Sequence, residues 1–302
     1  MQNEWATACA SLEPPVIIFN KSHSGSRMLA ELVAASGVFM GAHCNESLDS
    51  LDVFDLVSYA VRRYYPDYTA LWDPSRQTDS ELTRLIGDVF ERHLEGFDRR
   101  PGSRWGWKLC ETAYILPILN RCFPEARFIH LLRDGRDVAF CNHRAPDDEF
   151  WRKVYFNTGN IRTYRGLRFT PQAYRRQSHI YNAIHWLNSV TVGRNYGMML
   201  QERYLEVRYE DLCHNFEATG RKVLDFIDAP DSLSALQSMR TRVCPSSVGK
   251  YKKHSGRQQR EVMDIVKPML LSLGYLDGDP EFPSPWPWRS QFVDNLIDRW
   301  QK

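Results

Sequence analysis

The sequence contains no long hydrophobic run, although 43% of its 302 residues are hydrophobic. No stretch approaches the roughly 18 consecutive apolar residues that a transmembrane helix requires. The N-terminal segment M-Q-N-E-W-A-T-A-C-A also lacks the basic region and apolar core of a secretory signal. These absences predict a soluble cytoplasmic protein with no transmembrane segment.

Cysteine pairs at the spacing of metal or redox motifs are absent. The seven cysteines are scattered along the chain and include no C-x-x-C pair, so neither a disulfide framework nor a zinc site is expected. A strong excess of one charge is absent too, because 39 Lys and Arg residues face 37 Asp and Glu residues. The resulting net charge of +2 argues against a dedicated nucleic-acid-binding protein.

Apolar strand-like runs alternate with segments of helical periodicity. The predicted strands are residues 16–19, 105–109, 128–132 and 205–207. The predicted helices are residues 26–36, 49–64, 79–97, 114–122, 135–143, 171–194, 216–227 and 289–300. This alternation predicts an α/β fold in which helices flank a mainly parallel sheet, as in P-loop-like nucleotide-binding proteins, with helical insertions. Because no repeat or low-complexity linker divides the chain, residues 1–302 are expected to form a single domain that binds ligands beyond the carboxyl ends of its strands.

The first strand runs into a polar loop and then a helix, in the sequence V-I-I-F-N-K-S-H-S-G-S-R-M-L over residues 16–29. A turn of this kind aims backbone N–H groups at an anion, and its glycine lets the backbone approach closely. The candidate anion-binding residues of this loop are Lys21, Ser22, His23, Ser24, Gly25, Ser26 and Arg27. The alternative is a plain turn in which Ser24 or Ser26 caps the helix.

The loop lacks the lysine and the hydroxyl of an ATP- or GTP-binding P-loop. Where that motif ends in Gly-Lys-Ser/Thr, this chain has Gly25, Ser26 and Arg27. The side chains that would bridge the β- and γ-phosphates and hold magnesium are therefore missing. The loop suits a phosphate or sulfate-like group better than a magnesium-bound nucleoside triphosphate.

Two further segments suit anions. In R-F-I-H-L-L-R-D-G-R-D-V-A-F-C a buried strand ends at Arg133, and Arg136 follows in the first helical turn. An arginine fork at this place suits bidentate capture of a phosphate, whereas the alternative is an internal ion-pair cluster with Asp134 and Asp137. Residues 232–260 contain seven Lys and Arg residues and no acidic residue, and their core V-G-K-Y-K-K-H-S-G-R is a glycine-punctuated basic loop. The alternative for that stretch is a solvated basic face.

In this combination and order, the segments resemble the sulfotransferases that use 3′-phosphoadenosine 5′-phosphosulfate (PAPS), closest to their bacterial and tyrosylprotein-type branch. The resemblance implies that H-S-G-S-R at residues 23–27 binds the 5′-phosphosulfate. It implies a 3′-phosphate site in R-D-G-R-D-V-A-F-C, which begins at Arg133 and ends at Cys141. Tyr209, which opens Y-E-D-L, corresponds to a tyrosine that contacts adenine. A second 3′-phosphate element is implied at the basic loop of residues 249–253, which consists of Gly249, Lys250, Tyr251, Lys252 and Lys253.

The chain departs from the family pattern at two functional positions. His23 stands where the family has Lys or Arg, which leaves Lys21, His23 and Arg27 as candidates for the cation at the leaving phosphate. Cys141 stands where the family has serine, and a thiol is the weaker hydrogen-bonding group. More of the 3′-phosphate site is therefore expected to rest on Arg133 and the basic loop.

The resemblance also implies sulfuryl transfer with PAPS as cosubstrate, a general base and no metal. W-G-W-K ends at Lys108, which matches the lysine before the family's second catalytic segment. One branch places the base in the loop after the first helix, where Glu46 and His43 are candidates and Glu46 is favoured. Other branches place it just after the second strand, where Glu111 is the nearest match. Asp49 is interpreted as a helix-capping carboxylate.

An acceptor lid is expected at about residues 145–195, because residues 150–176 hold seven aromatic and seven basic side chains and no acidic one. Aromatic faces and arginines suit carbohydrate, phenol, lipid or peptide acceptors, and the sequence does not choose among them. The alternative is that the aromatic residues pack the lid against the body. Two other functions stay open: a P-loop small-molecule kinase, which Ser26 disfavours, and a non-enzymatic module that binds anions or nucleic acid. The oligomeric state is open as well.

Overall fold

The structure is a computed structural model that describes residues 13–65, 79–142, 150, 154, 171–229, 232–239 and 245–278. The helix predicted at residues 289–300 lies outside the described residues, as do residues 145–149, 151–153 and 155–170 of the lid expected at about residues 145–195. Among the helices of the described ranges, none is long and apolar enough to cross a membrane.

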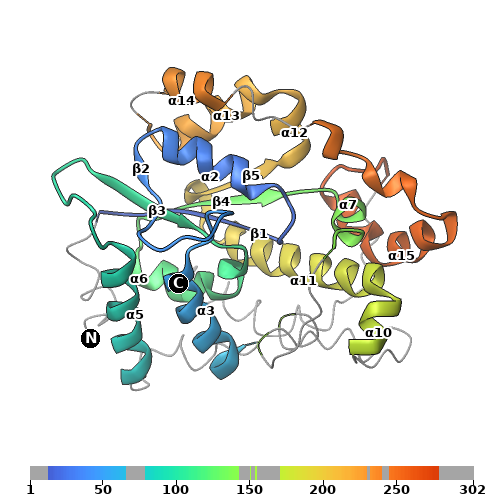
Figure 1. Ribbon diagram of the computed structural model, residues 1–302, viewed down its shortest axis with the longest axis horizontal. Coiled ribbons are helices and arrows are strands. Elements are labelled where there is room, and N and C mark those ends of the chain that lie inside the picture. Colours follow the sequence, from blue (N-terminus) through green and yellow to red (C-terminus); the bar gives the residue numbers. More distant parts are fainter. Residues whose placement is uncertain are drawn as a thin grey trace.

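Five parallel strands form the central sheet (Figure 1). They are β1 (Val16–Asn20), β2 (Val38–Phe39), β3 (Arg104–Lys108), β4 (Arg127–Leu132) and β5 (Tyr204–Arg208). Their order across the sheet is β2-β3-β1-β4-β5, and each neighbouring pair is parallel. The predicted α/β fold with a mainly parallel sheet is thereby confirmed. The sequence does not predict β2, because two residues carry no alternating pattern.

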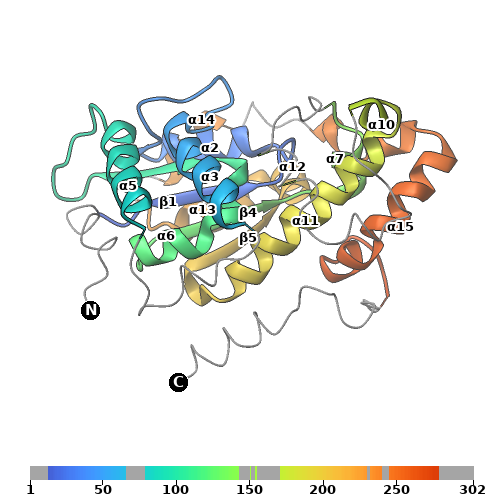
Figure 2. The same cartoon turned by 90° about the horizontal axis from the view of Figure 1, so that it is seen from below.

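Alternate residues of β1 point to opposite faces of the sheet and contribute to two cores. Ile17 and Phe19 belong to the core on one face, and Val16 and Ile18 to the core on the other. The first face is covered by α3 (Leu51–Tyr64), α5 (Ser80–His93), α6 (Leu116–Cys122) and α11 (Ser178–Met198). The second face is covered by α2 (Ser26–Ala35), α12 (Tyr209–His214), α13 (Phe216–Phe226) and α14 (Ser232–Met239). Figure 1 shows these two helical layers with the sheet between them, and Figure 2 views the molecule from the side of the first layer.

A third core joins α7 (Gly135–Ala139), α11 and α15 (Gly256–Ser272) at the end of β4. The sequence reading does not include α15. Its buried side chains recur three and four residues apart, at Val262, Ile265, Val266, Met269 and Leu270. The sequence does not predict this helix because its first turn is polar and basic and because Pro268 lies inside it, where proline normally breaks helical structure.

Three predicted helices have different ends in the structure. The helix predicted at residues 135–143 ends at Ala139, because Phe140 (φ −95°, ψ 8°) leaves the helical conformation. The helix predicted at residues 171–194 is broken at Gln177 (φ −135°, ψ 36°) into α10 (Pro171–Arg176) and α11. The helix predicted from residue 49 begins at Leu51, since Ser50 is its N-cap and accepts the N–H of Val53 at 3.2 Å.

The sheet topology places three loops next to one another at the carboxyl ends of the strands. The chain runs from β1 toward β2 on one side of the sheet and from β4 toward β5 on the other, which is the arrangement that binds ligands between adjacent strands of α/β sheets. Residues 21–25 follow β1, and residues 133 and 134 follow its neighbour β4. The 3₁₀ helix η1 (Cys110–Ile115) follows β3, which is the neighbour of β1 on its other side.

Candidate functional site

The first candidate loop, residues 21–25, bends sharply between β1 and α2. His23 (φ 69°) and Gly25 (φ 85°) both adopt the left-handed backbone conformation. The hydroxyl of Ser24 donates to the carbonyl oxygen of Lys21 at 2.6 Å. Gly25 is the N-cap of α2, and no side chain caps this helix. The alternative in which a serine caps the helix is therefore wrong, and the first turn of α2 presents N–H groups that suit an anion.

Substitution of Gly25 by alanine is expected to destabilise the fold. A Cβ atom at this position would lie 2.2 Å from Cε2 of Tyr209, at a φ of +85° that L-residues rarely adopt. Gly37→Ala is the matched control, since Gly37 has a φ of +89° but no atom within 4 Å of a Cβ there. Urea unfolding should give losses of about 2–5 kcal/mol for Gly25→Ala and about 1–2 kcal/mol for Gly37→Ala. Equal losses would show that the close approach to Tyr209 does not contribute to the destabilisation.

Arg133 ties the first loop to the basic loop. Its Nη1 donates to the carbonyl oxygen of His23 at 2.8 Å, and its Nη2 donates to that of Ser247 at 2.5 Å. The guanidinium lies over the ring of Tyr209, 4.7 Å from the centroid, and only 7% of the residue is exposed. Among the described residues, its buried Nε has no hydrogen-bond partner. One buried cation thus holds together segments that are distant in the sequence.

Arg136 does not join Arg133 in a phosphate fork. It forms a bidentate pair with Asp134, with its Nε 2.9 Å from Oδ1 and its Nη2 2.6 Å from Oδ2. Its guanidinium also lies over the ring of Tyr251, 4.5 Å from the centroid. For Arg136, the alternative of an internal ion pair with an aspartate is therefore the correct one.

Asp137 anchors the basic loop. One carboxylate oxygen accepts the N–H of Gly249 at 2.7 Å, and the other accepts the N–H of Tyr251 at 2.9 Å. Gly249 adopts the left-handed conformation (φ 75°) and starts the 3₁₀ helix η5 (Lys250–Lys253). The same carboxylate also pairs with Arg133, whose Nη2 lies 3.7 Å from Oδ2, so Asp137 connects the end of β4 to the basic loop.

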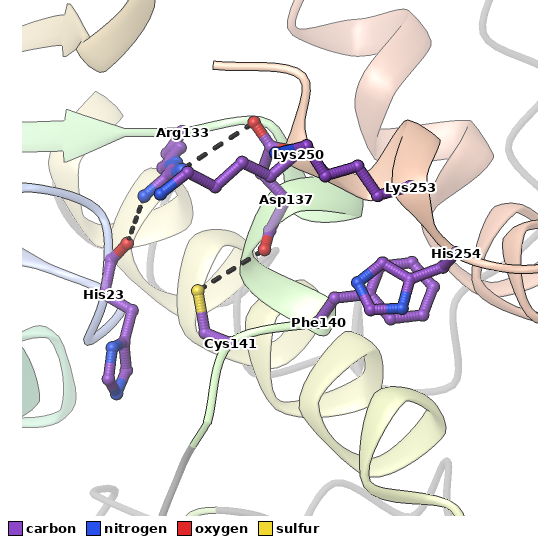
Figure 3. A pocket seen from close by; sticks show the side chains of 8 residues that line it. All are labelled: His23, Arg133, Asp137, Phe140, Cys141, Lys250, Lys253 and His254. Atoms are coloured by element: carbon purple, nitrogen blue, oxygen red, sulfur yellow. Dashed lines mark hydrogen bonds and ion pairs between the residues drawn. The ribbon is translucent and has the colours of Figure 1, made fainter. Parts of the chain in front are cut away.

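A cavity of about 450 Å³ opens beside Arg133 (Figure 3). Its lining residues are His23, Arg133, Asp137, Phe140, Cys141, Lys250, Lys253 and His254. Three strong cations face one carboxylate here, so the cavity is basic and suits an anion. The structure thus brings together five predicted residues from three segments: His23, Arg133, Cys141, Lys250 and Lys253. Of the other basic-loop residues, Lys252 is exposed and Tyr251 packs against Arg136.

Cys141 contributes a thiol to the cavity. Its Sγ donates to the carbonyl oxygen of Asp137 at 3.4 Å, one helical turn back. Burial raises the pKa of the thiol, against the opposing positive charges of Arg133 and Lys21. Cys141 is therefore a neutral, weak hydrogen-bonding group at neutral pH.

Lys21 and Glu111 are both buried, at the ends of β1 and β3, and the charge of each affects the pKa of the other. The Nζ of Lys21 donates to the hydroxyl of Ser22 at 2.5 Å. Burial lowers the pKa of Lys21 to about 8, while Glu111 and two cysteines act in the other direction. Burial, followed by the negative charge of Asp49, raises the pKa of Glu111 to about 7. The site thus holds a carboxyl group that changes charge near neutral pH.

Lys108 is buried and paired with Asp49. Its Nζ lies 2.7 Å from Oδ1 of Asp49, and only 2% of the Lys108 side chain is exposed. Asn45 shapes the loop before this pair, because its Oδ1 accepts the N–H groups of Ser47 and Asp49, each at 2.9 Å. The interpretation of Asp49 as a helix cap is wrong, since Ser50 caps α3 and Asp49 neutralises Lys108.

Glu46, His43 and Arg27 are exposed and do not line the cavity. Glu46 lies on the turn between Asn45 and Asp49. His43 pairs with Asp52 at 3.0 Å and with Glu95 at 3.7 Å. Arg27 pairs with Glu31 at 3.1 Å, one turn along α2, and 60% of its side chain is exposed.

His23 is a neutral group in the free site. Partial burial, followed by the positive charges of Lys21 and Arg133, lowers its pKa to about 4. Of the three candidates for the cation at the leaving phosphate, Lys21 is therefore the one that is both buried and charged at neutral pH.

The Y-E-D-L segment packs behind the site. Tyr209 lies against Gly25 and under Arg133. Glu210 accepts the N–H of Asp134 at 3.0 Å and the hydroxyl of Tyr275 at 2.6 Å, so it fixes the turn after β4.

The sequence assigns no site role to three residues that the structure places here: Asp49, Phe140 and His254. His254 directly follows the basic string K-Y-K-K, and that run of charge is the signal for it. No comparable signal in the sequence identifies Asp49 as the partner of Lys108, because the two residues are 59 positions apart.

Comparisons with known proteins find a matching family model and structures of similar fold. The family model described as "Sulfotransferase family" matches residues 15–232. No curated protein matches the sequence. The sulfotransferase domain of the Synechococcus PCC 7002 olefin synthase is similar in fold, with a TM-score of 0.52 and 15% identity over 88% of this chain and 96% of that domain. Sulfotransferase STF9 from Mycobacterium avium gives a TM-score of 0.48 and 13% identity over 89% of this chain and 78% of its own. Mouse sulfotransferase SULT7A1, solved in complex with PAP, gives a TM-score of 0.47 and 12% identity over 89% of both chains.

Proposed function

This chain belongs to the sulfotransferase family, and on that basis we propose that it transfers a sulfuryl group from PAPS to a hydroxyl or amine acceptor. The observation that carries the proposal is the connection that Arg133 makes between two anion-binding loops. PAPS has two separated anionic groups, at its 5′ and 3′ positions, and therefore needs two such loops. We assign the 5′-phosphosulfate to residues 21–25 with the first turn of α2. The 3′-phosphate is assigned to Arg133, Lys250 and Lys253 in the cavity.

Lys21 is proposed to stabilise the leaving group. An oxygen or nitrogen of the acceptor attacks the sulfur in line, and the bond between the sulfur and the 5′-phosphate oxygen breaks. The electron pair of that bond stays with adenosine 3′,5′-bisphosphate (PAP), so negative charge grows on its 5′-phosphate. A buried ammonium at this position stabilises the charge in a region of low dielectric constant.

Glu111 is proposed as the general base that takes the proton of the acceptor. It lies at the end of β3, beside the loop that holds Lys21, and burial with the charge of Asp49 raises its pKa to about 7. A base is most effective when its pKa is close to the working pH. Glu46, the residue that the sequence favours, is exposed on a turn, so we prefer Glu111 to it.

Cys141→Ser is expected to tighten the binding of PAP by about 2–10-fold, because a hydroxyl forms a stronger hydrogen bond than a thiol. Cys141→Ala is the matched control, since it removes the donor and leaves the surrounding cations. Isothermal titration calorimetry measures both affinities. Identical affinities of the serine and alanine variants would contradict a contact between position 141 and the nucleotide.

A thermal-shift panel tests the proposed function against its alternatives. PAP should raise the melting temperature and Mg-ATP should not. Stabilisation by Mg-ATP alone would instead support a kinase. Binding of RNA with a steep salt dependence, without stabilisation by either nucleotide, would support a nucleic-acid-binding module.

The acceptor class is addressed by a screen that follows PAP release. Phenols, carbohydrates, lipids and peptides are incubated with PAPS, and PAP is separated and quantified. An acceptor should raise PAP release above the rate with water alone, and the sulfated product should carry one added sulfuryl group in mass spectrometry.

A further inference from the structure

His254 follows the basic turn directly and lines the cavity with Lys250, Lys253 and Arg133. Its backbone is held on both sides. The backbone N–H of His254 donates to the carbonyl oxygen of Tyr251 at 3.1 Å. The carbonyl oxygen of His254 accepts a hydrogen bond from Nε2 of Gln259 at 2.7 Å. The imidazole is therefore attached to a fixed point of the cavity wall.

The ring of His254 is oriented by stacking. It lies parallel to the ring of Phe140, with centroids 3.8 Å apart and an angle of 8° between the planes (Figure 3). Stacking uses the face of an imidazole and leaves the nitrogens at its edge open to hydrogen bonds. Among the described residues, neither ring nitrogen of His254 is used in a hydrogen bond. A half-buried imidazole is thus fixed in plane and has unused donor capacity inside a basic cavity.

Cys141, which follows Phe140 in the chain, also lines the cavity. Cys141 supplies a weak thiol there, and its Sγ is directed to the carbonyl oxygen of Asp137. In contrast, an imidazole donates at least one N–H in either protonation state. Arg133, Lys250 and Lys253 line the same space, so a ligand group beside His254 is expected to be anionic.

We propose that His254 is a ligand of the nucleotide 3′-phosphate and contributes to the selection of nucleotides that carry this group. The proposal rests on the proposed PAPS-dependent function. His254 supplies the hydrogen bond that Cys141 provides only weakly, and the stack on Phe140 holds its ring in place for that bond.

The test compares two ligands that differ only in the 3′-phosphate. Calorimetric titrations with PAP and with adenosine 5′-monophosphate are made on the wild type and on His254→Ala. We expect the substitution to weaken PAP binding by about tenfold or more, since hydrogen bonds to charged groups have effects of this size. Binding of the monophosphate should change less than about twofold. His254→Gln, which keeps an N–H donor and the side-chain bulk, should recover part of the loss.

His179→Ala is the matched control. The His179 ring also lies parallel to that of Phe140, at 5.8 Å and 11°, but His179 pairs with Glu261 and is absent from the lining of the cavity. This variant should keep the wild-type ratio of the two affinities. An equal loss of both ligands in His254→Ala and His254→Gln would overturn the proposal and leave the proposed function intact. A wild type that binds PAP no more tightly than the monophosphate would overturn the proposed function itself.

Discussion

Glu111→Gln is expected to lower the turnover number by about 10²–10⁴-fold, the usual contribution of a general base. The amide has the size of the carboxyl group but cannot accept the acceptor's proton. PAP affinity should stay within about threefold of wild type, because Glu111 is assigned to the acceptor proton and not to the nucleotide. Turnover is measured as PAP released from PAPS with an acceptor from the screen, and affinity by calorimetry.

Glu46→Gln is the matched control for this substitution. Glu46 is exposed on its turn, so its amide variant should retain wild-type turnover. A large loss in Glu46→Gln together with normal turnover in Glu111→Gln would move the base to the residue that the sequence favours. Normal turnover in both variants would direct attention to His43, the third candidate.

The pH profile tests Glu111 independently. A base acts in its deprotonated form, and burial with the charge of Asp49 raises the pKa of Glu111 to about 7. The value of kcat/KM should therefore fall as the pH drops through about 7, instead of near the ordinary carboxyl range of about 4. A profile that is flat between pH 5.5 and pH 8 would contradict the assignment.

Arg133→Ala is expected to weaken PAP binding by about 100-fold and to lower the free energy of unfolding by about 2–4 kcal/mol. The substitution removes two charge-assisted hydrogen bonds, leaves the carbonyl oxygens of His23 and Ser247 without this donor, and uncovers the ring of Tyr209. Calorimetry measures the binding, and urea unfolding measures the stability.

Arg27→Ala is the control for the loss of one positive charge. Its exposed pair with Glu31 lies on α2, and exposed pairs of this kind contribute about 0–1 kcal/mol. If Arg133→Ala and Arg27→Ala bind PAP equally well, Arg133 does not connect the two halves of the nucleotide site.

The sequence predicts the parts of the site that are local. A β-branched run followed by a polar loop with Gly25 predicts the turn after β1, and Arg133 at the end of an apolar run predicts the turn after β4. Both turns are at the predicted places because strand and helix periodicity is a property of short segments. The four main strands and the parallel sheet follow from the same periodicity.

Which side chains pair with one another is what the sequence could not supply. The string around Arg136 contains two carboxylates and an anion-suited turn, and only the folded chain decides that Asp134 takes its guanidinium. The pairing of Lys108 with Asp49 and the stacking of His254 on Phe140 likewise depend on the packing of separate elements. The choice between Glu46 and Glu111 also changes with the structure, because burial separates two carboxylates that look alike in sequence.

The most direct test of the central claim is calorimetric titration of the wild-type protein with PAP in the presence of EDTA. We predict saturable binding at one site per chain, at least about tenfold tighter than that of adenosine 5′-monophosphate, since the 3′-phosphate adds charge-assisted contacts. Removal of divalent cations should leave the affinity unchanged. No binding of PAP under these conditions, together with saturable binding of Mg-ATP, would contradict the account.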